Sequence, residues 1–342
     1  MISRVADHCF WLGRYLERAE STARVLGVTR NLALDSELLP HQCWSPVLIV
    51  SGEERPFVER HGEDAVGDGE EVQKYMTWAE DNHASILRSV GAARENARSI
   101  REVVSLEGWE AINELYLYVR SPAAHDDYAS DRFGYFRHIR QSVQLVHGVV
   151  QGTMLHETPL DFLWLGVLLE RVGQTARTLD VQHHALTAFE LAGRPDGMAV
   201  AAMMRRQVIE TALWLSLLRA CAGFETFMKR NQGLVGGKAV ATFLVKEPRF
   251  PRSLHYCVHA AYLKLCAIRP TEHHHLPGGK VLERLHALDG WLDRLDLSSV
   301  DAEEIHTLLT HVVDETAAIC DDLGRELLGH DVHASIPPPP PP

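Results

Sequence analysis

The sequence predicts an all-α protein, a multi-helix bundle built from an internal duplication. Two observations support this fold class: apolar residues recur at helical spacing through most of the chain, and one helical segment occurs twice. Alternating apolar and polar residues, the pattern typical of strands, are scarce. The short apolar runs at 47–52 and 241–245 are compatible with helix ends. The 342 residues can bury a substantial core.

The repeated segment is eighteen residues long. Residues 11–28 read WLGRYLERAESTARVLGV and residues 164–181 read WLGVLLERVGQTARTLDV, with eleven identical positions at a constant offset of 153. Weaker matches follow in the same order and pair Trp44 with Trp214, Ser85 with Ser253, and Trp109 with Trp291. The second half of the chain is therefore predicted to be a diverged copy of the first.

The repeated helix has an apolar stripe with polar residues on both flanks. The stripe comprises Leu12, Tyr15, Leu16, Ala19, Ala23 and Leu26, and its copy comprises Leu165, Leu168, Leu169, Val172, Ala176 and Leu179. One flank repeats Gly13, Glu17 and Arg24 as Gly166, Glu170 and Arg177, and the other repeats Trp11, Arg18 and Thr22 as Trp164, Arg171 and Thr175. Arg14, Ser21 and Val25, which face away from the stripe, are not repeated. We therefore expect a central bundle helix that is constrained on three sides and free on the fourth.

The repeated charges require partners, because Glu and Arg are rarely buried unless they are paired. Glu17 and Arg18 are adjacent and point to different flanks, so each is expected to find a partner on another helix. The same applies to Glu170 and Arg171. The glycine one turn before each glutamate would let a second backbone approach closely. Two interpretations remain open: interhelical ion pairs that fix helix register, or a polar pocket between the repeats.

Apolar spacing predicts the other helices as well. They are expected within 81–120 with an interruption at 105–108, and at 131–155, 199–230, 254–269, 280–295 and 301–329. Asp81 and Asn82 are candidate N-caps for the first of these. Residues 51–72, rich in Gly, Glu and Asp, are predicted to form a loop.

The domain organisation follows from the absence of a linker between the halves. We expect a single domain over 1–335, with repeat halves of about 1–150 and 151–335. The Pro-rich end, 336–342, is predicted to be a disordered tail outside the fold.

Arginine-rich segments supply further candidate binding residues. Arg98 lies in a stripe with Arg94 and Arg101 at helical spacing. Arg252 and Ser253 follow a proline where a helix should begin, and a hydroxyl with an arginine at a helix N-terminus is suited to binding a carboxylate or phosphate. N-capping combined with ordinary ion pairs is the alternative interpretation.

No metal site is predicted. The three histidines at 273–275 lie in a loop that imposes no coordination geometry. Asp180, His183 and His184 share a helical face but lack the second motif of a di-iron bundle. The glycine-rich stretch near Lys238 is not a phosphate-binding loop, because Ala239 stands where Ser or Thr is needed.

The composition excludes several classes of function. The chain has 34 Lys and Arg against 46 Asp and Glu, a formal net charge of −12, and no basic cluster, so neither nucleic acid nor an anionic membrane is an expected partner. No stretch reaches the roughly 18 apolar residues of a membrane helix. Six scattered cysteines and the lack of a signal-peptide core favour a reduced, cytoplasmic protein.

The sequence resembles the alpha-E domain family, all-helical proteins named for an ER motif. The resemblance rests on SRVADHCFWLGRYLERAESTAR, SILRSVGAARENARSIREVVSLEGWEAIN, FLWLGVLLERVGQTARTLDV and FPRSLHYCV, and it covers nearly the whole chain. The chain departs from the family pattern near Ser85 and within 45–72. The resemblance implies that the protein is encoded beside, or fused to, a circularly permuted ATP-grasp ligase, often with a transglutaminase-like protein nearby.

The expected function is therefore that of a component in an ATP-grasp-associated system that forms peptide or amide bonds or modifies peptides. A polar pocket between the repeats would bind a peptide or its acyl-phosphate intermediate. Glu17 and Glu170 are the candidate catalytic residues, which would orient or deprotonate an amine. The candidate substrate- or anion-binding residues are Arg18, Arg24, Arg98, Arg171, Arg177, Arg252 and Ser253. No intrinsic cofactor is expected, and ATP and Mg would be bound by the partner ligase.

Two alternatives remain. In a structural adaptor, the same charges would only fix helix packing, and Glu17→Gln or Arg18→Met would lower stability without a separate loss of ligand binding. A stand-alone enzyme acting on a small amine or acid is the other alternative, and the missing nucleotide and metal motifs count against it.

Overall fold

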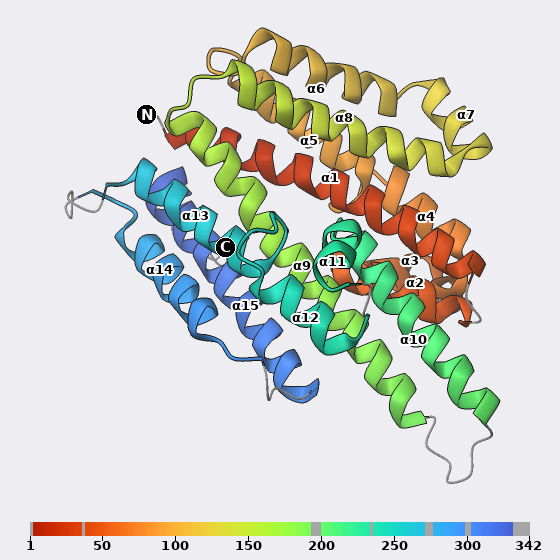
Figure 1. Cartoon of the computed structure of the whole chain (residues 1–342). Coiled ribbons are helices and arrows are strands. Elements are labelled where there is room, and N and C mark those ends of the chain that lie inside the picture. The colour runs from red at the N-terminus through yellow and green to blue at the C-terminus, as the bar shows by residue number, and fades with distance from the viewer. Residues whose placement is uncertain are drawn as a thin grey trace, which may run out of the picture.

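The computed structural model describes residues 3–35, 38–192, 200–232, 235–270, 276–297 and 302–330, and within these ranges the chain is helical without a strand (Figure 1). The α-helices are α1 (Ser3–Asp35), α2 (Pro40–Ser51), α3 (Glu54–His61), α4 (Gly69–Trp78), α5 (Ile86–Ser99), α6 (Leu106–Val119), α7 (Pro122–Ser130), α8 (Arg132–Thr153), α9 (Thr158–Ala192), α10 (Val200–Ala220), α11 (Phe224–Arg230), α12 (Gly237–Lys246), α13 (Leu254–Ile268), α14 (Gly279–Arg294) and α15 (Ala302–Leu323). A 3₁₀ turn, η1 (Glu63–Gly67), and a π-helical turn, η2 (Gly324–Leu328), complete the list.

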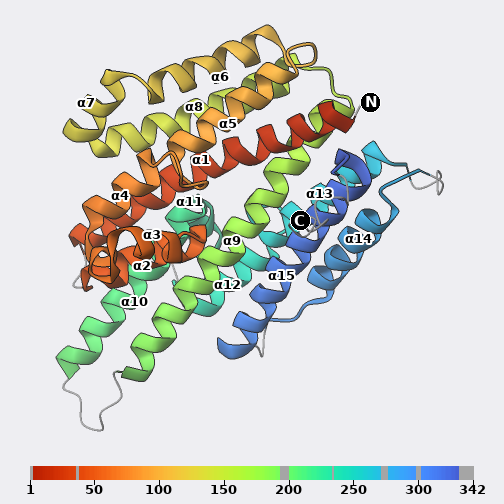
Figure 2. The same ribbon diagram turned by 180° about the vertical axis from the view of Figure 1, so that it is seen from behind.

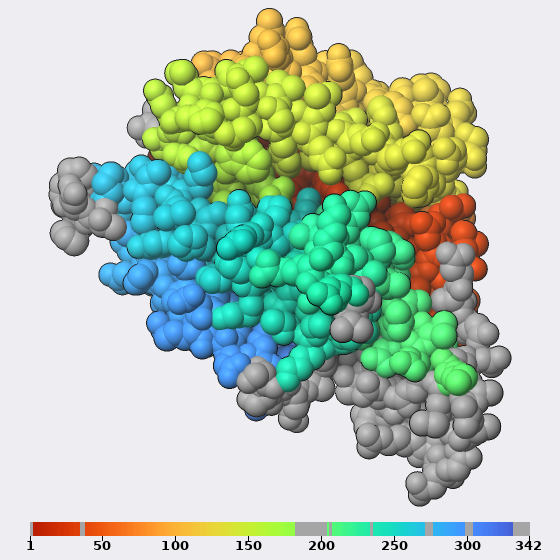
Figure 3. All heavy atoms as spheres, in the orientation of Figure 1, coloured from red at the N-terminus to blue at the C-terminus, as the bar shows by residue number. Residues whose placement is uncertain are grey.

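The long helices α1 and α9 pack together at the centre of the bundle. Helices α5 and α8 pack on α1, with α6 and α7 outside them, and α13 and α15 pack on α9, with α14 outside them (Figures 1 and 2). In the space-filling view, the middle of α1 is visible only as a narrow red strip between the layers above and below it (Figure 3). The apolar stripes predicted for α1 and α9 are buried, except that Tyr15 of α1 is only partly buried.

Each half of the chain also contributes a helix that packs on the central helix of the other half. Helix α2 contacts α9 as well as α1, and α10 contacts α1 as well as α9. The two halves are therefore interlocked, because neither central helix is covered by its own half alone.

The backbones of α1 and α9 touch at two glycines. A Cβ atom added to Gly13 would lie 2.1 Å from the carbonyl oxygen of Leu163, and one added to Gly166 would lie 2.1 Å from the carbonyl oxygen of Phe10. Only glycine permits this approach. The close backbone contact expected from the sequence is confirmed.

Both contacts join positions related by the offset of 153. The hydroxyls of Thr22 and Thr175 are likewise related, and they donate to the carbonyl oxygens of Ala84 and Arg252, the residues before the matched serines. The duplication itself remains a prediction from the sequence, and these reciprocal contacts support it.

The prediction of a loop over residues 51–72 is wrong. Helix α3 and the turn η1 lie within it, and α4 begins at Gly69. Phe57 anchors α3 and is fully buried, while the Asp68 carboxylate accepts the Glu70 and Glu71 amides at the start of α4. A single apolar anchor produces no helical periodicity, whereas a high content of Gly, Glu and Asp is typical of a loop.

Two other boundaries differ from the prediction. Ser85, rather than Asp81 or Asn82, caps α5, and its hydroxyl accepts the amide of Arg88 at 3.1 Å. The helix predicted over 199–230 is broken into α10 and α11, because Ala222 adopts a left-handed conformation with φ of 54°.

Some predicted features fall outside this description. The Pro-rich segment 336–342 and the histidines at 273–275 lie beyond the described residues. None of the helices described has an apolar stretch long enough to cross a membrane.

Candidate functional site

The repeated Glu-Arg pairs meet crosswise where α1 and α9 cross. Glu17 of α1 pairs with Arg171 of α9, with 3.0 Å between Oε2 and Nε. Glu170 of α9 pairs with Arg18 of α1, with 2.8 Å between Oε1 and Nε. The glycine contact lies one turn before each pair, so the glutamate of either helix faces the arginine of the other. Each charge therefore finds its partner on another helix, as predicted.

Glu17 belongs to the first of two charge clusters. The Glu17 cluster comprises Glu17, Glu20, Arg24, Arg171 and Arg252. Arg252 bridges both carboxylates, with Nη1 2.6 Å from Glu17 and Nη2 2.7 Å from Glu20. Arg24 pairs with Glu20 one turn away on α1. Each carboxylate in this cluster therefore contacts two guanidinium groups.

Ser253 holds Arg252 in place. Its hydroxyl caps α13 by accepting the amide of Tyr256 at 3.1 Å, and it donates to the carbonyl oxygen of Glu247 at 2.6 Å. Both hydrogen-bonding roles of this buried hydroxyl are used within the protein. Ser253 is therefore in the position expected from the sequence, but it supports the neighbouring arginine rather than presenting a free donor.

The environment of Glu17 makes it a weak base. Burial alone would raise its pKa, but Arg171 and Arg252 outweigh burial and lower the pKa to about 2. Burial also lowers the pKa of the adjacent His147 to about 4, although Glu17 opposes this shift. A carboxylate held so strongly in its charged form is poorly suited to deprotonating an amine. The catalytic role of Glu17 remains a prediction, and its surroundings favour a structural one.

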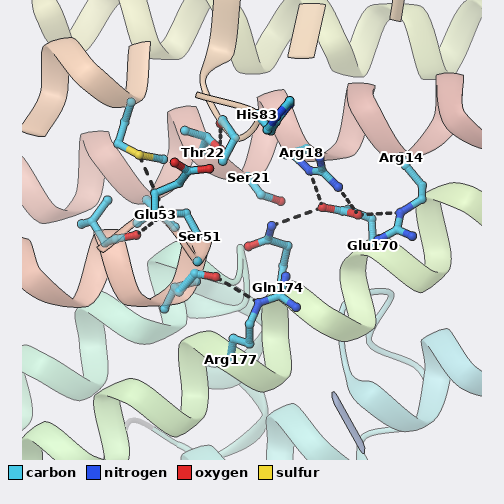
Figure 4. Close-up of a pocket in the computed structure, with 16 residues that line it drawn as sticks. Arg14, Arg18, Ser21, Thr22, Ser51, Glu53, His83, Glu170, Gln174 and Arg177 are labelled. Carbon is cyan, nitrogen blue, oxygen red and sulfur yellow. Dashed lines mark hydrogen bonds and ion pairs between the residues drawn. The ribbon is translucent and has the colours of Figure 1, made fainter. Parts of the chain in front are cut away.

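The second cluster surrounds Glu170. The Glu170 cluster comprises Arg14, Arg18, Glu170, Gln174 and Arg177 (Figure 4). Arg14 Nε lies 2.8 Å from Glu170, and the Gln174 amide donates to Glu170 at 3.4 Å. Burial would raise the pKa of Glu170, but Arg14 and Arg18 hold it well below its usual range. This carboxylate can orient cations around it but, like Glu17, is a weak base.

A cavity of about 320 Å³ adjoins the Glu170 cluster. Helices α1, α2, α4 and α9 form its walls, together with the segment before α5. Its lining includes Arg14, Arg18, Ser21, Thr22, Val25, Val47, Val50, Ser51, Gly52, Glu53, Met76, His83, Ala84, Glu170, Gln174 and Arg177. Gly52 and His83 are exposed and mark its opening to solvent. A volume of this size is within the range of small-molecule sites, which run from about 300 to 1,000 Å³.

Arg177 is the unusual cation of this cavity. Its Nε donates to the backbone carbonyl of Val50 at 3.0 Å. No carboxylate of the described residues forms a salt bridge with it, and burial together with Arg14 and Arg18 lowers its pKa, against the opposing effect of Glu170. Gly173, one turn earlier, leaves room for the guanidinium, since a Cβ there would lie 3.0 Å from Nη1. Arg177 is therefore a partly buried cation that lines a cavity without an anionic partner of its own.

Two differences between the repeats create this arrangement. Position 173 corresponds to Glu20 at the offset of 153, so Arg24 has a carboxylate one turn away and Arg177 has a glycine. Ala84 precedes Ser85 where Arg252 precedes Ser253. The first cluster is thus filled and paired, while the second retains a cavity and an excess of positive charge.

The face of α1 predicted to be free is not free. Arg14, Ser21 and Val25, the positions that are not repeated, line the cavity. On α9 the counterpart of Arg14 is Val167, which is fully buried. The sequence comparison correctly found that this face differs between copies, but the difference reflects a cavity rather than exposure to solvent.

Most of the sequence-predicted site residues converge at the crossing, and one does not. The Glu17 cluster contains Glu17, Arg24, Arg171 and Arg252, next to Ser253, and the Glu170 cluster contains Arg18, Glu170 and Arg177. Arg98 lies apart on α5, where its side chain is 61% exposed and pairs with Glu95 at 2.7 Å. The clusters and the cavity also contain four residues that were not predicted from the sequence: Arg14, Glu20, Gln174 and Glu53. The first three stand at positions that differ between the copies, and that difference was the available signal.

Within the described part of the chain, no group of three or more His, Cys, Asp or Glu side chains could hold a metal ion. Asp180, considered above as part of a histidine-rich face, pairs with His306 at 2.7 Å.

A family model named Alpha-E, described as a predicted alpha-helical domain with a conserved ER motif, matches residues 1–328. The chain belongs to the Alpha-E family. No curated protein and no solved structure matches it. In this Alpha-E protein the crossing of α1 and α9 carries two Glu-Arg sequences, Glu17-Arg18 and Glu170-Arg171, which pair with each other.

Proposed function

We propose that this Alpha-E protein binds an anionic group, a carboxylate or a phosphate, in the cavity beside Glu170. The observation that carries this proposal is Arg177, which lines the cavity and lacks a carboxylate partner among the described residues. Leaving a desolvated cation without a counterion is costly, and a bound anion would supply one. Arginine is also the side chain best suited to pairing with carboxylate and phosphate.

The other members of the cluster have supporting roles in this proposal. Arg14 and Arg18 are fixed by Glu170, so they add positive potential without being free to move. The Ser21 hydroxyl lines the cavity near them and can donate to the same anion. Glu170 positions these groups and does not act as a base, because its pKa lies well below its usual range.

The setting we propose is an ATP-grasp-associated system that forms peptide or amide bonds or modifies peptides. Membership of the Alpha-E family is its support. The partner ligase would bind ATP and Mg, and the bound anion would be the carboxylate of an amino acid or peptide, or its acyl phosphate. A transglutaminase-like protein is a further proposed partner. The proposed compartment is the cytoplasm, and the six cysteines, all free thiols, are compatible with it.

The test is ligand binding by the full chain, measured by isothermal titration calorimetry with inorganic phosphate and N-acetylglycine. We expect Arg177→Met to weaken binding at least tenfold, because one charge-assisted pair is lost. Gly173→Glu should have the same effect, because its Cβ would lie 3.0 Å from Nη1 of Arg177 and its carboxylate would pair with the shifted guanidinium, as Glu20 does with Arg24. Arg98→Met, on an exposed arginine away from the cavity, is the matched control and should bind normally. A wild-type protein that binds neither anion, or an Arg177→Met variant that binds both normally, would refute the site.

The Glu17 cluster favours the second candidate, a structural adaptor. Its carboxylates are almost fully buried, and each already contacts two guanidinium groups. Such a cluster has no vacancy for a ligand and fixes the register of α1, α9 and α13. If Arg177→Met binds anions normally, this role extends to both clusters.

A further inference from the structure

We infer that the cavity takes a small zwitterion, an amino acid or a dipeptide, with its carboxylate on Arg177 and its ammonium group at Glu53. This inference rests on the proposed function and specifies its substrate class. It adds a second recognition residue, Glu53, from a part of the chain that the sequence analysis assigned to a loop.

Glu53 is the negative counterpart of Arg177 in this cavity. It follows Gly52, the left-handed residue that ends α2, and its side chain lines the cavity. Its Oε2 accepts a hydrogen bond from the Tyr75 hydroxyl at 2.8 Å. Neither a Lys nor an Arg of the described residues forms a salt bridge with it. Burial and Glu53 raise the pKa of Tyr75, so the phenol keeps the proton that it donates to Oε2. No hydrogen bond within the described part of the chain uses the other carboxylate oxygen, Oε1.

Glu53 and Arg177 line the same cavity. Figure 4 shows Glu53 toward one end of the cavity and Arg14, Arg18 and Glu170 toward the other, with Arg177 below them in this view. Apolar side chains of α1, α2 and α4 complete the lining, namely Val25, Val47, Val50 and Met76. A ligand that carries both an amine and a carboxylate would satisfy both protein charges at once. A simple anion would pair with Arg177 but leave Glu53 without a cation. The site should therefore favour a zwitterion over a simple anion.

The volume limits the size of this ligand. About 320 Å³ lies at the lower end of the range for small-molecule sites. A single amino acid or a dipeptide suits such a space, whereas a longer peptide would have to leave most of its length outside. The exposed residues at the opening, Gly52 and His83, provide the route for entry.

The experiment compares two ligands that differ in one group. Glycylglycine and N-acetylglycine have the same backbone and carboxylate, but only glycylglycine has a free ammonium group. We expect the full-length protein to bind glycylglycine about tenfold more tightly, as measured by calorimetry at neutral pH. Glu53→Gln should remove this preference and leave the affinity for N-acetylglycine unchanged. The amide can still accept from Tyr75, so the fold should be kept, and the melting temperature checks this.

The control is Glu54→Gln, on the exposed neighbour whose carboxylate accepts from Ser45 at 3.1 Å outside the cavity. It should leave both affinities unchanged. Equal binding of the two ligands by the wild type, or a preference that survives Glu53→Gln, would overturn the zwitterion inference while anion binding stands. Binding of neither ligand, nor of inorganic phosphate, would refute the proposed function together with the inference.

Discussion

Glu17 and Glu170 occupy matched positions in the two similar segments of α1 and α9, yet their neighbours give them different surroundings. Glu17 is enclosed by Arg171 and Arg252, which fill the space around it. Glu170 is held by arginines that border a cavity. The difference comes from few residues, above all Gly173, whose missing side chain leaves Arg177 without a neighbouring carboxylate.

At this scale we predict that Glu17→Gln lowers the free energy of unfolding by about 3 kcal/mol, because it leaves Arg171 and Arg252 with too little negative charge in a buried site. Denaturant unfolding measures this effect. Adding Arg252→Met to Glu17→Gln should cost less than the sum of the two single changes, by about 1 kcal/mol or more. Additive losses would mean that Glu17 and Arg252 are not energetically coupled. Arg98→Met again serves as a control and should change stability by no more than about 0.5 kcal/mol.

At the scale of elements, the crossing of α1 and α9 determines where the clusters form. The glycine contact brings the two backbones together, and the Glu-Arg pairs one turn later face each other as a consequence. Interhelical distance therefore controls the ion-pair geometry, and a small change at the glycine should affect both clusters.

Gly13→Ala should lower the free energy of unfolding by more than about 2 kcal/mol, because its Cβ would lie 2.1 Å from a backbone oxygen of α9 and the helices would have to separate. Gly148→Ala is the matched control. It changes an exposed helical glycine of α8 with no atom within 4 Å of the added Cβ, so it should stabilise the protein by about 0.5–1 kcal/mol. Thermal or denaturant unfolding of both variants gives the comparison. Equal effects of the two changes would mean that the contact at Gly13 is not tight.

The sequence was informative about elements whose residues repeat or show strong periodicity. It identified most of the longer helices but not the shorter α2, α7 and α12. It also identified the close glycine contact and the need of Glu17 and Arg18 for partners on other helices. It could not assign Glu53, which lines a cavity formed by several distant segments and belongs to no pattern. The position of Arg14 differs between the two repeats, but this difference alone did not distinguish a cavity from a solvent-exposed face. Helix α3 was missed for a related reason, since Phe57 alone fixes it in the core.

At the scale of the whole molecule, buried ionisable groups should make stability depend strongly on pH. His147 is buried against Trp164 and is surrounded by Glu17, Glu20, Arg171 and Arg252. Its pKa falls from about 6.5 to about 4 on folding, so between these values the unfolded chain binds more protons than the folded one. Stability is therefore lost as the pH falls from 6.5 toward 4, by on the order of 3 kcal/mol.

At lower pH, protonation of the buried carboxylates lowers the free energy of unfolding further. The pKa of Glu17 is lowered from its ordinary 4.5 to about 2, and those of Glu20 and Glu170 are lowered too, so protonating them favours the unfolded chain as the pH falls through this range. Unfolding free energies measured from pH 7 to pH 4 check the first stage. His147→Gln should flatten the curve between pH 6.5 and 4 and leave the acidic stage intact. An unchanged slope in the variant would contradict this assignment.

The interlocked halves also constrain how the chain can be made. Synthesis proceeds from the amino terminus, and the ion-pair partners of Glu17 are Arg171 and Arg252. The helices α5 and α8, which belong to the same half, can cover one side of α1 as soon as they are made. The side of α1 that meets α9 stays uncovered, and Glu17 lacks its cationic partners, until the segments that carry Arg171 and Arg252 have been synthesised. Alpha-E is thus a fold in which α1 acquires its packing partners in two separate stages of synthesis.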